Sequence, residues 1–351
     1  MSDEIYLRPA AFLWGRAAWE AIASGHAIAI AGGPAASPLF EVIEGTPQTS
    51  RRSFLTAHDL AESSDAAIAK RLSLISTQRT QVAGLSMDRP RVMGIVNVTP
   101  DSFSDGGDFD TAEKAAAHVS RIIEEGADLI DIGGESTRPG AAPVDVAEEL
   151  RRVLPAIQAA KPFNCPISID TRKSAVMKVA LEAGASIIND VSALTYDGDT
   201  PMVVTEADAP VVLMHAQGDP RTMQDAPAYD DVLLEVYDFL EARIAAAIGA
   251  GIAREKLIAD PGIGFGKTLE HNLALLSGLG LFHGLGVPLL LGVSRKRSIG
   301  ALTGESDPKR RVSGSIGAAL AGAAQGAQMF RVHDVRETVH ALTCWQASVT
   351  N

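Results

Sequence analysis

Short apolar runs rich in Val, Ile and Leu alternate with amphipathic stretches over most of the chain. The run at residues 92–98 has the β-branched composition of a buried strand. From Thr111 to about Glu125, apolar side chains recur every three or four positions, which is the spacing of one helix face. Further strand-like runs lie at 129–133, 166–170, 186–190, 210–215, 257–261, 288–293 and 328–332. Helix-like stretches follow them at 146–159, 174–183, 231–250, 269–278, 313–325 and 335–347, and a short connection at 201–207 follows the fourth run.

This alternation predicts a parallel sheet, because parallel strands need crossover connections that are usually helical. Eight strand–helix units in ~260 residues match a (β/α)8 barrel of the α/β class, the TIM-barrel architecture, in count and length. A doubly wound open sheet is the alternative. The count of eight, and the lack of a Gly-rich phosphate-binding fingerprint after the first strand, favour the barrel.

Residues 1–88 have a different pattern without the repeated unit. Runs at 27–31 and 39–43 predict short strands, and 57–73 predicts a helix. We expect a small N-terminal extension of uncertain α/β structure and unknown role, packed on a barrel of residues 89–351. A separate functional module and a partly disordered arm are the alternatives.

Composition narrows the classes of partner. The net charge of -12 argues against nucleic acid, because phosphate backbones need a basic surface. Two cysteines, Cys165 and Cys344, fit a reducing compartment without a disulfide framework. No run is long enough to span a membrane, and the N-terminus lacks the basic region of a signal peptide. We expect a cytoplasmic protein with no membrane partner.

Polar residues stand at the same end of every predicted strand. In chain order they are Asn97 and Thr99, Asp131 and Glu135, Asp170, Asn189 and Asp190, His215, Asp260, Ser294 to Lys296, and Arg331 and His333. One such residue is often only a helix cap. Eight cases at the carboxyl ends of barrel strands predict one shared polar pocket, where the active sites of such barrels lie.

The predicted pocket has two chemical characters. Asp170, Asn189 and Asp260 offer mainly hydrogen-bond acceptors, which suits a flat heterocycle with N–H groups along one edge, and Lys296 adds a donor. Arg331 and His333 are two positions apart on a strand and point the same way.

With Asn97 and Arg138, Arg331 and His333 predict an anion subsite, because Arg suits phosphate groups. The alternatives are a salt bridge at the barrel rim for Arg331 and a capping or core role for His333. No cluster has the ligand spacing of a tight zinc site, so a weakly held Mg2+ on a phosphate is expected instead.

Three loops at this end, residues 100–108, 136–143 and 218–229, are predicted to close over substrate, with ordinary surface connections as the alternative. The first two carry Ser102, Phe103, Thr137, Arg138 and Pro139.

Long motifs over residues 89–351 resemble the dihydropteroate synthase family. They include GIVNVTPDSFSDGG (94–107), GADLIDIGGESTRPGA (126–141), ISIDTRK (167–173), IADPGIGFGKT (258–268), LLGVSRKRSIG (290–300) and FRVHDV (330–335). The resemblance implies a transferase of folate biosynthesis and a sulfonamide target. The enzyme would condense 6-hydroxymethyl-7,8-dihydropterin pyrophosphate with p-aminobenzoate to give 7,8-dihydropteroate and pyrophosphate. It also implies a homodimer.

Carried over by motif, the resemblance assigns roles to individual residues. The pterin would contact Asp170, Asn189, Met214, Asp260, Phe265, Lys296 and Arg331. The pyrophosphate would contact Asn97, Thr137, Arg331 and His333, with Mg2+ near Asn97. The p-aminobenzoate would contact Phe103, Thr137, Arg138, Pro139, Ser294 and Lys296. The catalytic set would be Asn97, Arg138, Lys296, Arg331 and His333.

One position departs from the family pattern. Arg297 stands where members often carry a Ser near the aminobenzoate carboxylate, so that contact stays open. Two other functions are weighed: a pterin-binding barrel that serves methyl transfer, and a non-catalytic pterin-binding paralogue.

Overall fold

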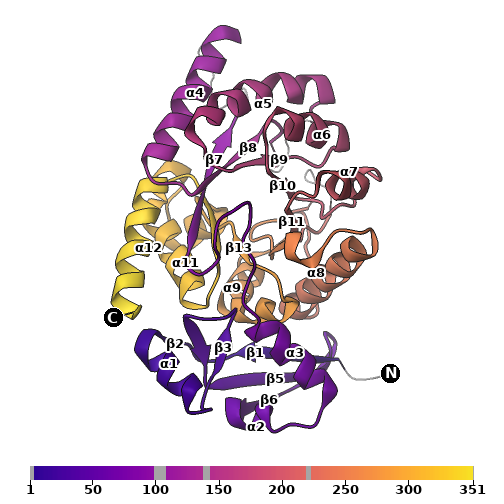
Figure 1. Ribbon diagram of the computed structural model, residues 1–351, viewed down its shortest axis with the longest axis vertical. Coiled ribbons are helices and arrows are strands. Elements are labelled where there is room, and N and C mark those ends of the chain that lie inside the picture. Colours follow the sequence, from indigo (N-terminus) through magenta and orange to yellow (C-terminus); the bar gives the residue numbers. More distant parts are fainter. Residues whose placement is uncertain (1–3, 99–107, 137–142, 219–222, 351) are drawn as a thin grey trace.

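A computed structural model describes residues 4–98, 108–136, 143–218 and 223–350 (Figure 1). Within these ranges eight parallel strands form a barrel, as the alternating pattern predicts. They are β7 (Arg91–Asn97), β8 (Leu129–Gly133), β9 (Ile167–Asp170), β10 (Ile187–Asp190), β11 (Val211–Met214), β12 (Leu257–Asp260), β13 (Leu290–Leu291) and β14 (Met329–Val332). The strand order is β12-β11-β10-β9-β8-β7-β14-β13, and a parallel bridge between Ala259 and Leu289 joins the two outer strands. The barrel is therefore nearly closed.

Helices surround the barrel (Figure 1). They are α4 (Asp108–Glu124), α5 (Val146–Ala160), α6 (Ser174–Ala183), α7 (Thr200–Ala207), α8 (Val232–Gly249), α9 (Leu269–Ser277), α10 (Arg297–Thr303), α11 (Val312–Ala324) and α12 (Val335–Thr350). Short 3-10 helices are η2 (Lys161–Phe163), η3 (Arg254–Lys256), η4 (Leu279–Leu285) and η5 (Pro308–Arg310). None of the described helices is both long and apolar enough to cross a bilayer.

Three boundaries differ from the sequence prediction. The first barrel helix, α4, begins at Asp108, ahead of the predicted start. Residues 201–207, expected as a short connection, belong to the regular helix α7. β13 is two residues long, whereas the apolar run predicted six, because its ladder to β14 has only two pairs and its link to β12 is a single bridge.

Residues 4–76 form a separate layer, here called the N-terminal lobe. Its elements are β1 (Ile5–Pro9), β2 (Leu13–Trp14), α1 (Gly15–Ala23), β3 (Ile28–Ile30), β4 (Ala35–Ser37), β5 (Leu39–Thr46), β6 (Thr49–Thr56), α2 (Ala57–Ala61) and α3 (Ala66–Ser76). Two antiparallel sheets, β1-β5-β6 and β2-β4-β3, enclose a core that includes Leu7, Phe40 and Ile75. The single helix predicted at 57–73 is two helices, because Asp65 accepts from the backbone of Ala67 and Ile68 and starts a new one.

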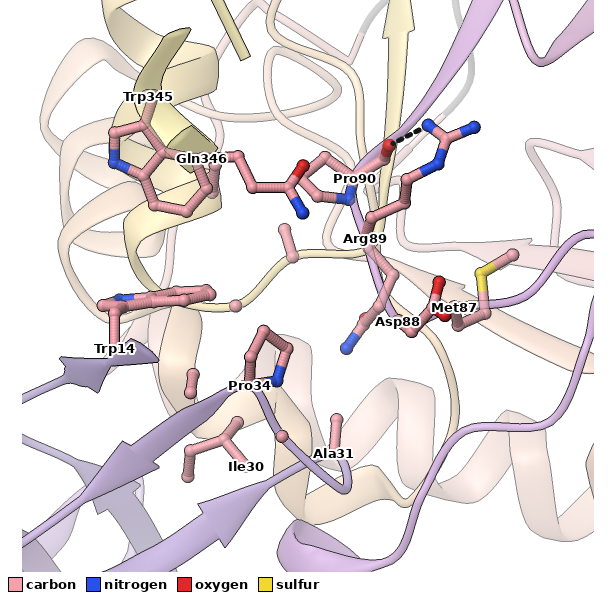
Figure 2. A pocket seen from close by; sticks show the side chains of 16 residues that line it. Trp14, Ile30, Ala31, Pro34, Met87, Asp88, Arg89, Pro90, Trp345 and Gln346 are labelled. Atoms are coloured by element: carbon pink, nitrogen blue, oxygen red, sulfur yellow. Dashed lines mark hydrogen bonds between the residues drawn. The ribbon is translucent and has the colours of Figure 1, made fainter. Parts of the chain in front are cut away.

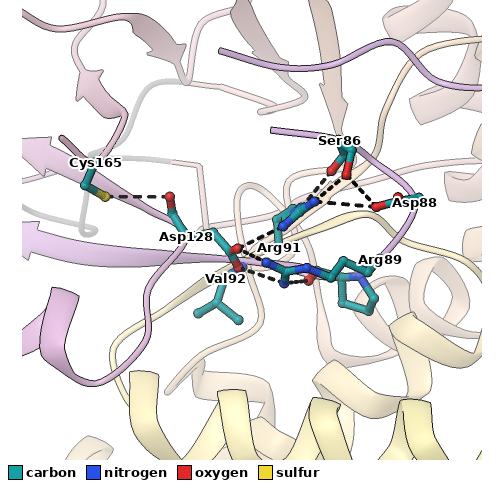
Figure 3. A network of polar contacts seen from close by, with 8 residues as sticks. Ser86, Asp88, Arg89, Arg91, Val92, Asp128 and Cys165 are labelled. Carbon is teal, nitrogen blue, oxygen red and sulfur yellow. Dashed lines mark hydrogen bonds and ion pairs between the residues drawn. The ribbon is translucent and has the colours of Figure 1, made fainter. Parts of the chain in front are cut away.

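The segment between the lobe and β7 closes the amino end of the barrel. Val82 and Met87 pack with Met93 and with apolar residues near the amino ends of most other strands, such as Leu129 and Met329. Figure 3 shows how this segment is fixed: Arg91 Nε donates to Ser86 O at 2.6 Å, and Arg91 Nη1 donates to Asp128 Oδ1 at 3.1 Å. The polar residues that end the strands lie at the opposite end of the barrel.

The lobe lies against the barrel flank near α8, α9 and the C-terminal end of α12 (Figure 1). Trp14 and Trp345 meet edge to face, with ring centroids 4.9 Å apart. Next to this contact, Figure 2 shows a small cavity bordered by Pro34, Arg89 and Gln346. It adjoins a space of about 360 Å³ beside Trp19. Both lie at the amino end of the barrel, away from the polar strand ends.

Candidate active site

Four polar side chains on β8, β9, β10 and β14 form one hydrogen-bonded cluster. Arg331 Nε donates to Asp131 Oδ2 at 2.6 Å, and Arg331 Nη2 donates to Asp170 Oδ2 at 2.8 Å. Asn189 Nδ2 donates to the same Asp131 oxygen at 3.0 Å. We call these residues the carboxylate–guanidinium cluster. Because each comes from a different barrel strand, sheet register rather than loop conformation fixes their relative positions.

The cluster is short of positive charge. Two carboxylates face one guanidinium, so full ionisation leaves one net negative charge. Asp131 is 0% exposed, and its Oδ1 has no hydrogen-bond partner among the described residues. Burial, opposed by Arg331 and reinforced by the charge of Asp131, raises the pKa of Asp170 to about 7. Asp170 therefore changes charge near neutral pH.

A second carboxylate–cation arrangement faces the cluster from β12 and α10. Asp260 ends β12, its Oδ1 accepts from Gly262 N at 2.7 Å, and burial raises its pKa. Lys296 starts α10, and its Nζ lies 4.3 Å from the centre of the Phe265 ring. The Lys296 side chain is partly buried, and burial lowers its pKa to about 8 against the opposing effect of Asp260. Lys296 thus stays mainly protonated at neutral pH.

Lys267 holds together the loop that carries Phe265. Its Nζ lies 2.8 Å from His215 Nδ1, and it donates to Gly262 O at 2.9 Å and to Phe265 O at 3.0 Å. Burial lowers the pKa of Lys267 to about 7 and that of His215 to about 3. A neutral His215 accepts at Nδ1, so the amine is fully satisfied and the loop is fixed.

Ser294 and His333 meet between the ends of β13 and β14. His333 N donates to Ser294 Oγ at 3.1 Å, and His333 Nδ1 lies 3.0 Å from the same oxygen. Arg295 between Ser294 and Lys296 has a left-handed φ of 57°, and its Nε donates to Asp334 Oδ2 at 3.0 Å. This strained position, stabilised by the ion pair, turns the chain sharply between the two site residues.

Glu135 joins the two sides of the loop after β8. Lys173 Nζ donates to Glu135 Oε2 at 2.8 Å and to Glu149 Oε2 at 2.5 Å, while Val144 N donates to Glu135 Oε1 at 3.3 Å. Glu149 is buried. The ends of the segment that contains residues 137–142 are thus anchored to a buried ion-pair network.

Most residues predicted for the site stand at the carboxyl ends of strands or just after them. They are Asn97, Asp170, Asn189, Met214, Asp260, Phe265, Ser294, Lys296, Arg331 and His333. Phe103, Thr137, Arg138 and Pro139 lie outside the described residues. Arg331 is in an ion pair, which was the alternative to an open anion receptor, but its partners are site carboxylates rather than rim residues.

Two residues of the site were missed by sequence reasoning. Asp131 was noted only as a strand end, and Lys267 was not singled out. The signal for Asp131 is a charged residue inside an apolar strand, because a buried carboxylate needs a partner. Its partner Arg331 is remote in sequence, so only the closed barrel identifies it.

The donor set for a metal is sparse. Over the described ranges, no three or more His, Cys, Asp or Glu side chains are grouped so as to hold an ion. Asn97 stands at the end of β7 beside Gly133 and offers one amide oxygen. Such a site fits Mg2+ only if substrate oxygens and water supply most of its ligands.

Comparison with known proteins identifies the family of this chain. Residues 93–333 match the family described as pterin binding enzyme. A dihydropteroate synthase of Neisseria meningitidis serogroup B is 51% identical over 268 residues, which are 75% of this chain and 94% of that protein.

Two solved structures of a dihydropteroate synthase from Xanthomonas albilineans are also similar. One, with 4-aminobenzoic acid, has 55% identity and a TM-score of 0.73, over 77% of this chain and 97% of that one. The other, in complex with 7,8-dihydropteroate, has 53% identity and a TM-score of 0.69, over 75% of this chain and 95% of that one. The chain therefore belongs to the pterin-binding enzyme family, among the dihydropteroate synthases.

Proposed function

We propose that this chain joins 6-hydroxymethyl-7,8-dihydropterin pyrophosphate to p-aminobenzoate, giving 7,8-dihydropteroate and pyrophosphate. The observation that carries the proposal is the set of acceptors and one amine gathered at the carboxyl ends of the barrel strands, in a chain of this family. The transfer forms one carbon–nitrogen bond and breaks one carbon–oxygen bond.

The pterin edge would lie against Asp170, Asn189 and Asp260. Two buried carboxylates accept the ring N–H and amino groups, and Lys296 donates to a ring carbonyl or nitrogen. Met214 at the end of β11, the Phe265 ring and the Arg331 guanidinium would pack around the heterocycle. Donors of the pterin satisfy carboxylates that are costly to leave buried alone, and this favours the correct ring over analogues without those groups.

The pyrophosphate would lie toward Asn97, Arg331 and His333, with Thr137 from the adjacent loop. Arg331 already uses Nε and Nη2 on Asp131 and Asp170. An anion contact would therefore use its Nη1, which has no hydrogen-bond partner within the described part of the chain.

The p-aminobenzoate site would combine Ser294 and Lys296 with Phe103, Thr137, Arg138 and Pro139. Only the first two are described, and the ion pairs around Glu135 anchor the ends of the loop that carries the last three. The catalytic set proposed is Asn97, Arg138, Lys296, Arg331 and His333.

The reaction needs no nucleophilic side chain. The bond between the pterin methylene and the pyrophosphate oxygen breaks, the electron pair leaves with pyrophosphate, and the ring stabilises the carbon cation. The neutral aniline nitrogen then attacks and loses its proton to solvent or pyrophosphate. Protein residues orient both partners and stabilise the leaving anion. Asp170 and Asp260 are not assigned as an obligatory general base.

Mg2+ is the proposed cofactor. Asn97 would supply one oxygen ligand, and the pyrophosphate and water would supply the others. When bound, the ion neutralises charge on the leaving group. We also propose a cytoplasmic homodimer.

Pyrophosphate release measured with purified protein tests the function. Release that requires both substrates, together with formation of 7,8-dihydropteroate, is the expected result. Tight pterin binding without release would favour a non-catalytic pterin-binding protein, and methyl transfer from a methylated reduced pterin would favour the methyltransferase type. Release from the pterin substrate alone supports the dissociative order, and strict dependence of carbon–oxygen cleavage on the amine argues against it.

A further inference from the structure

We propose that the N-terminal lobe positions the pterin-binding loop, through the β5–β6 hairpin and the start of α8. The family match begins at residue 93, so the lobe lies outside it. The inference rests on the proposed function only for the identity of the substrate that the loop would bind. Its structural basis is a continuous chain of contacts from the lobe to the loop of residues 262–268.

The β5–β6 hairpin forms side-chain hydrogen bonds with the residues directly before α8. Arg52 on β6 donates from Nη2 to Asp231 Oδ2 at 2.5 Å, and Gln48 at the hairpin turn donates from Nε2 to Asp230 Oδ2 at 2.7 Å. Arg52 Nη1 also donates to Glu41 Oε1 of β5 at 3.4 Å. Arg52 is therefore held by the lobe at one side and by the barrel at the other.

Asp231 is also the N-cap residue of α8. Its Oδ1 caps α8 by accepting from Leu233 N at 3.0 Å and Leu234 N at 3.2 Å. Glu235 Oε1 in turn accepts from Asp230 N at 2.6 Å. The contact with the hairpin thus acts on a tightly hydrogen-bonded helix start and not on a loose loop.

Tyr229, directly before these residues, reaches the pterin loop. Its hydroxyl donates to Gly266 O at 2.8 Å, and its ring lies edge to face with His271, with centroids 4.9 Å apart. At Gly266 a Cβ would come within 2.4 Å of Gln217 O, so the loop has no spare room beside the chain after β11. The neighbouring Lys267 ties that loop to His215.

Other contacts hold the lobe against α8 independently of the hairpin. Arg71 Nη1 donates to Tyr237 OH at 2.8 Å and forms an ion pair with Glu241, and Tyr6 OH donates to Asp238 Oδ1 at 2.8 Å. These residues lie further along α8. Removal of the hairpin contacts is therefore expected to leave the lobe in place while it removes the support that the hairpin gives to Asp230 and Asp231.

The test compares the double variant Gln48→Ala/Arg52→Ala with Arg51→Ala. Arg51 lies on the same strand, and its ion pair with Glu44 is within the lobe. We expect the double variant to raise KM for the dihydropterin pyrophosphate by about 3- to 10-fold, because a less ordered loop must be fixed on binding. KM for p-aminobenzoate and the Tm are expected to stay close to the parent values, and Arg52→Lys to restore part of the loss.

Coupling to Tyr229 separates positioning from a general loss of stability. Tyr229→Phe removes the hydroxyl bond to Gly266, and we expect its effect on pterin KM to be non-additive with that of the hairpin variant. Full additivity, an unchanged pterin KM, or equal rises in both KM values would refute the proposal. If the double variant fails to fold, Asp231→Ser gives the same test, since Ser keeps a helix cap without the charge.

Measured binding of 6-hydroxymethylpterin distinguishes failure of the positioning role from failure of the proposed enzymatic function. If the parent protein forms no dihydropteroate, the proposed function fails, and Kd for the pterin still reports on the loop. An unchanged pterin Kd in the hairpin variant would then overturn the positioning role on its own.

Discussion

Replacement of Asp131 by Asn probes the centre of the carboxylate–guanidinium cluster. The side chain keeps its shape, so an amide oxygen can still accept from Arg331 Nε and Asn189 Nδ2. What is lost is one buried negative charge. Arg331 then has Asp170 as its one remaining carboxylate partner in the cluster.

The expected loss of stability follows from breaking one member of a buried ion pair. Such changes cost roughly 3–5 kcal/mol where they leave a buried charge unpaired, and about 3 kcal/mol is the upper limit here because Asp170 still pairs with the guanidinium and the cluster loses its excess negative charge. About 3 kcal/mol corresponds to a fall in Tm of about 4 °C, because the unfolding entropy of a chain of 351 residues is about 0.7 kcal/mol/K. Calorimetry on the parent and the variant measures it.

The pH dependence of pterin binding gives the sharper result. If the pterin edge binds an ionised Asp170, as proposed, affinity should fall as pH drops through the raised pKa of Asp170, about 7. The charge of Asp131 contributes to that raised pKa, so Asp131→Asn should lower the pKa and move the loss of affinity to lower pH. Fluorescence titration with 6-hydroxymethylpterin between about pH 5 and 9 follows this change.

Asp190→Asn is the matched control. Asp190 is equally buried, but it accepts from Ser192 and from Leu194 N, and its effect on Asp170 is weaker than that of Asp131. Asp190→Asn should lower the Tm, but it should shift the pH dependence of pterin binding less than Asp131→Asn does. If Asp131→Asn lowers Tm and leaves the acid limb of binding where it is in the parent, Asp131 is only structural and the reasoning on charge fails.

Three further predictions concern the same pocket. The kcat/KM for the pterin substrate should rise with pH through about 7, as Asp170 ionises, and fall above about 8, as Lys296 loses its proton, and Asp170→Asn should remove the acid limb. Lys267→Met should raise pterin KM several-fold with little change in p-aminobenzoate KM, measured by steady-state kinetics, because it frees the loop of Phe265. Asn97→Ala should raise the Mg2+ concentration needed for half-maximal rate, whereas Phe103→Ala should mainly change p-aminobenzoate and sulfonamide binding, and the reverse pattern would contradict the two assignments.

The barrel could be predicted because its signals are local. Each strand is an apolar run, each helix has its own period, and the polar residue that ends the strand stands next to both. β13 was predicted too long because Pro288 and Val293 continue the apolar run, while the pairing that limits the strand depends on β12 and β14. Pairing partners are not a property of the run itself.

The N-terminal lobe was harder to predict for the opposite reason. β6 is the edge strand of its sheet, and seven of its eight residues are exposed, so it has no apolar face to detect. Its Arg52 reads from sequence as a solvated charge, yet it contacts a residue 179 positions away. The contacts that give the lobe its proposed role are therefore those that carry no sequence signal.

Arg331 illustrates how the structure changes the meaning of a correctly chosen residue. Sequence reasoning placed it in an anion subsite, but two of its nitrogen atoms are committed to Asp131 and Asp170. The same guanidinium cannot offer a planar fork to pyrophosphate while it holds both carboxylates. In the proposed function it would therefore act at the boundary of the two subsites, where it would order the acceptors for the pterin and leave one nitrogen for the anion. Replacement by Lys keeps the charge but cannot make both carboxylate contacts and the anion contact in one plane, so it should impair pterin binding as well as pyrophosphate release.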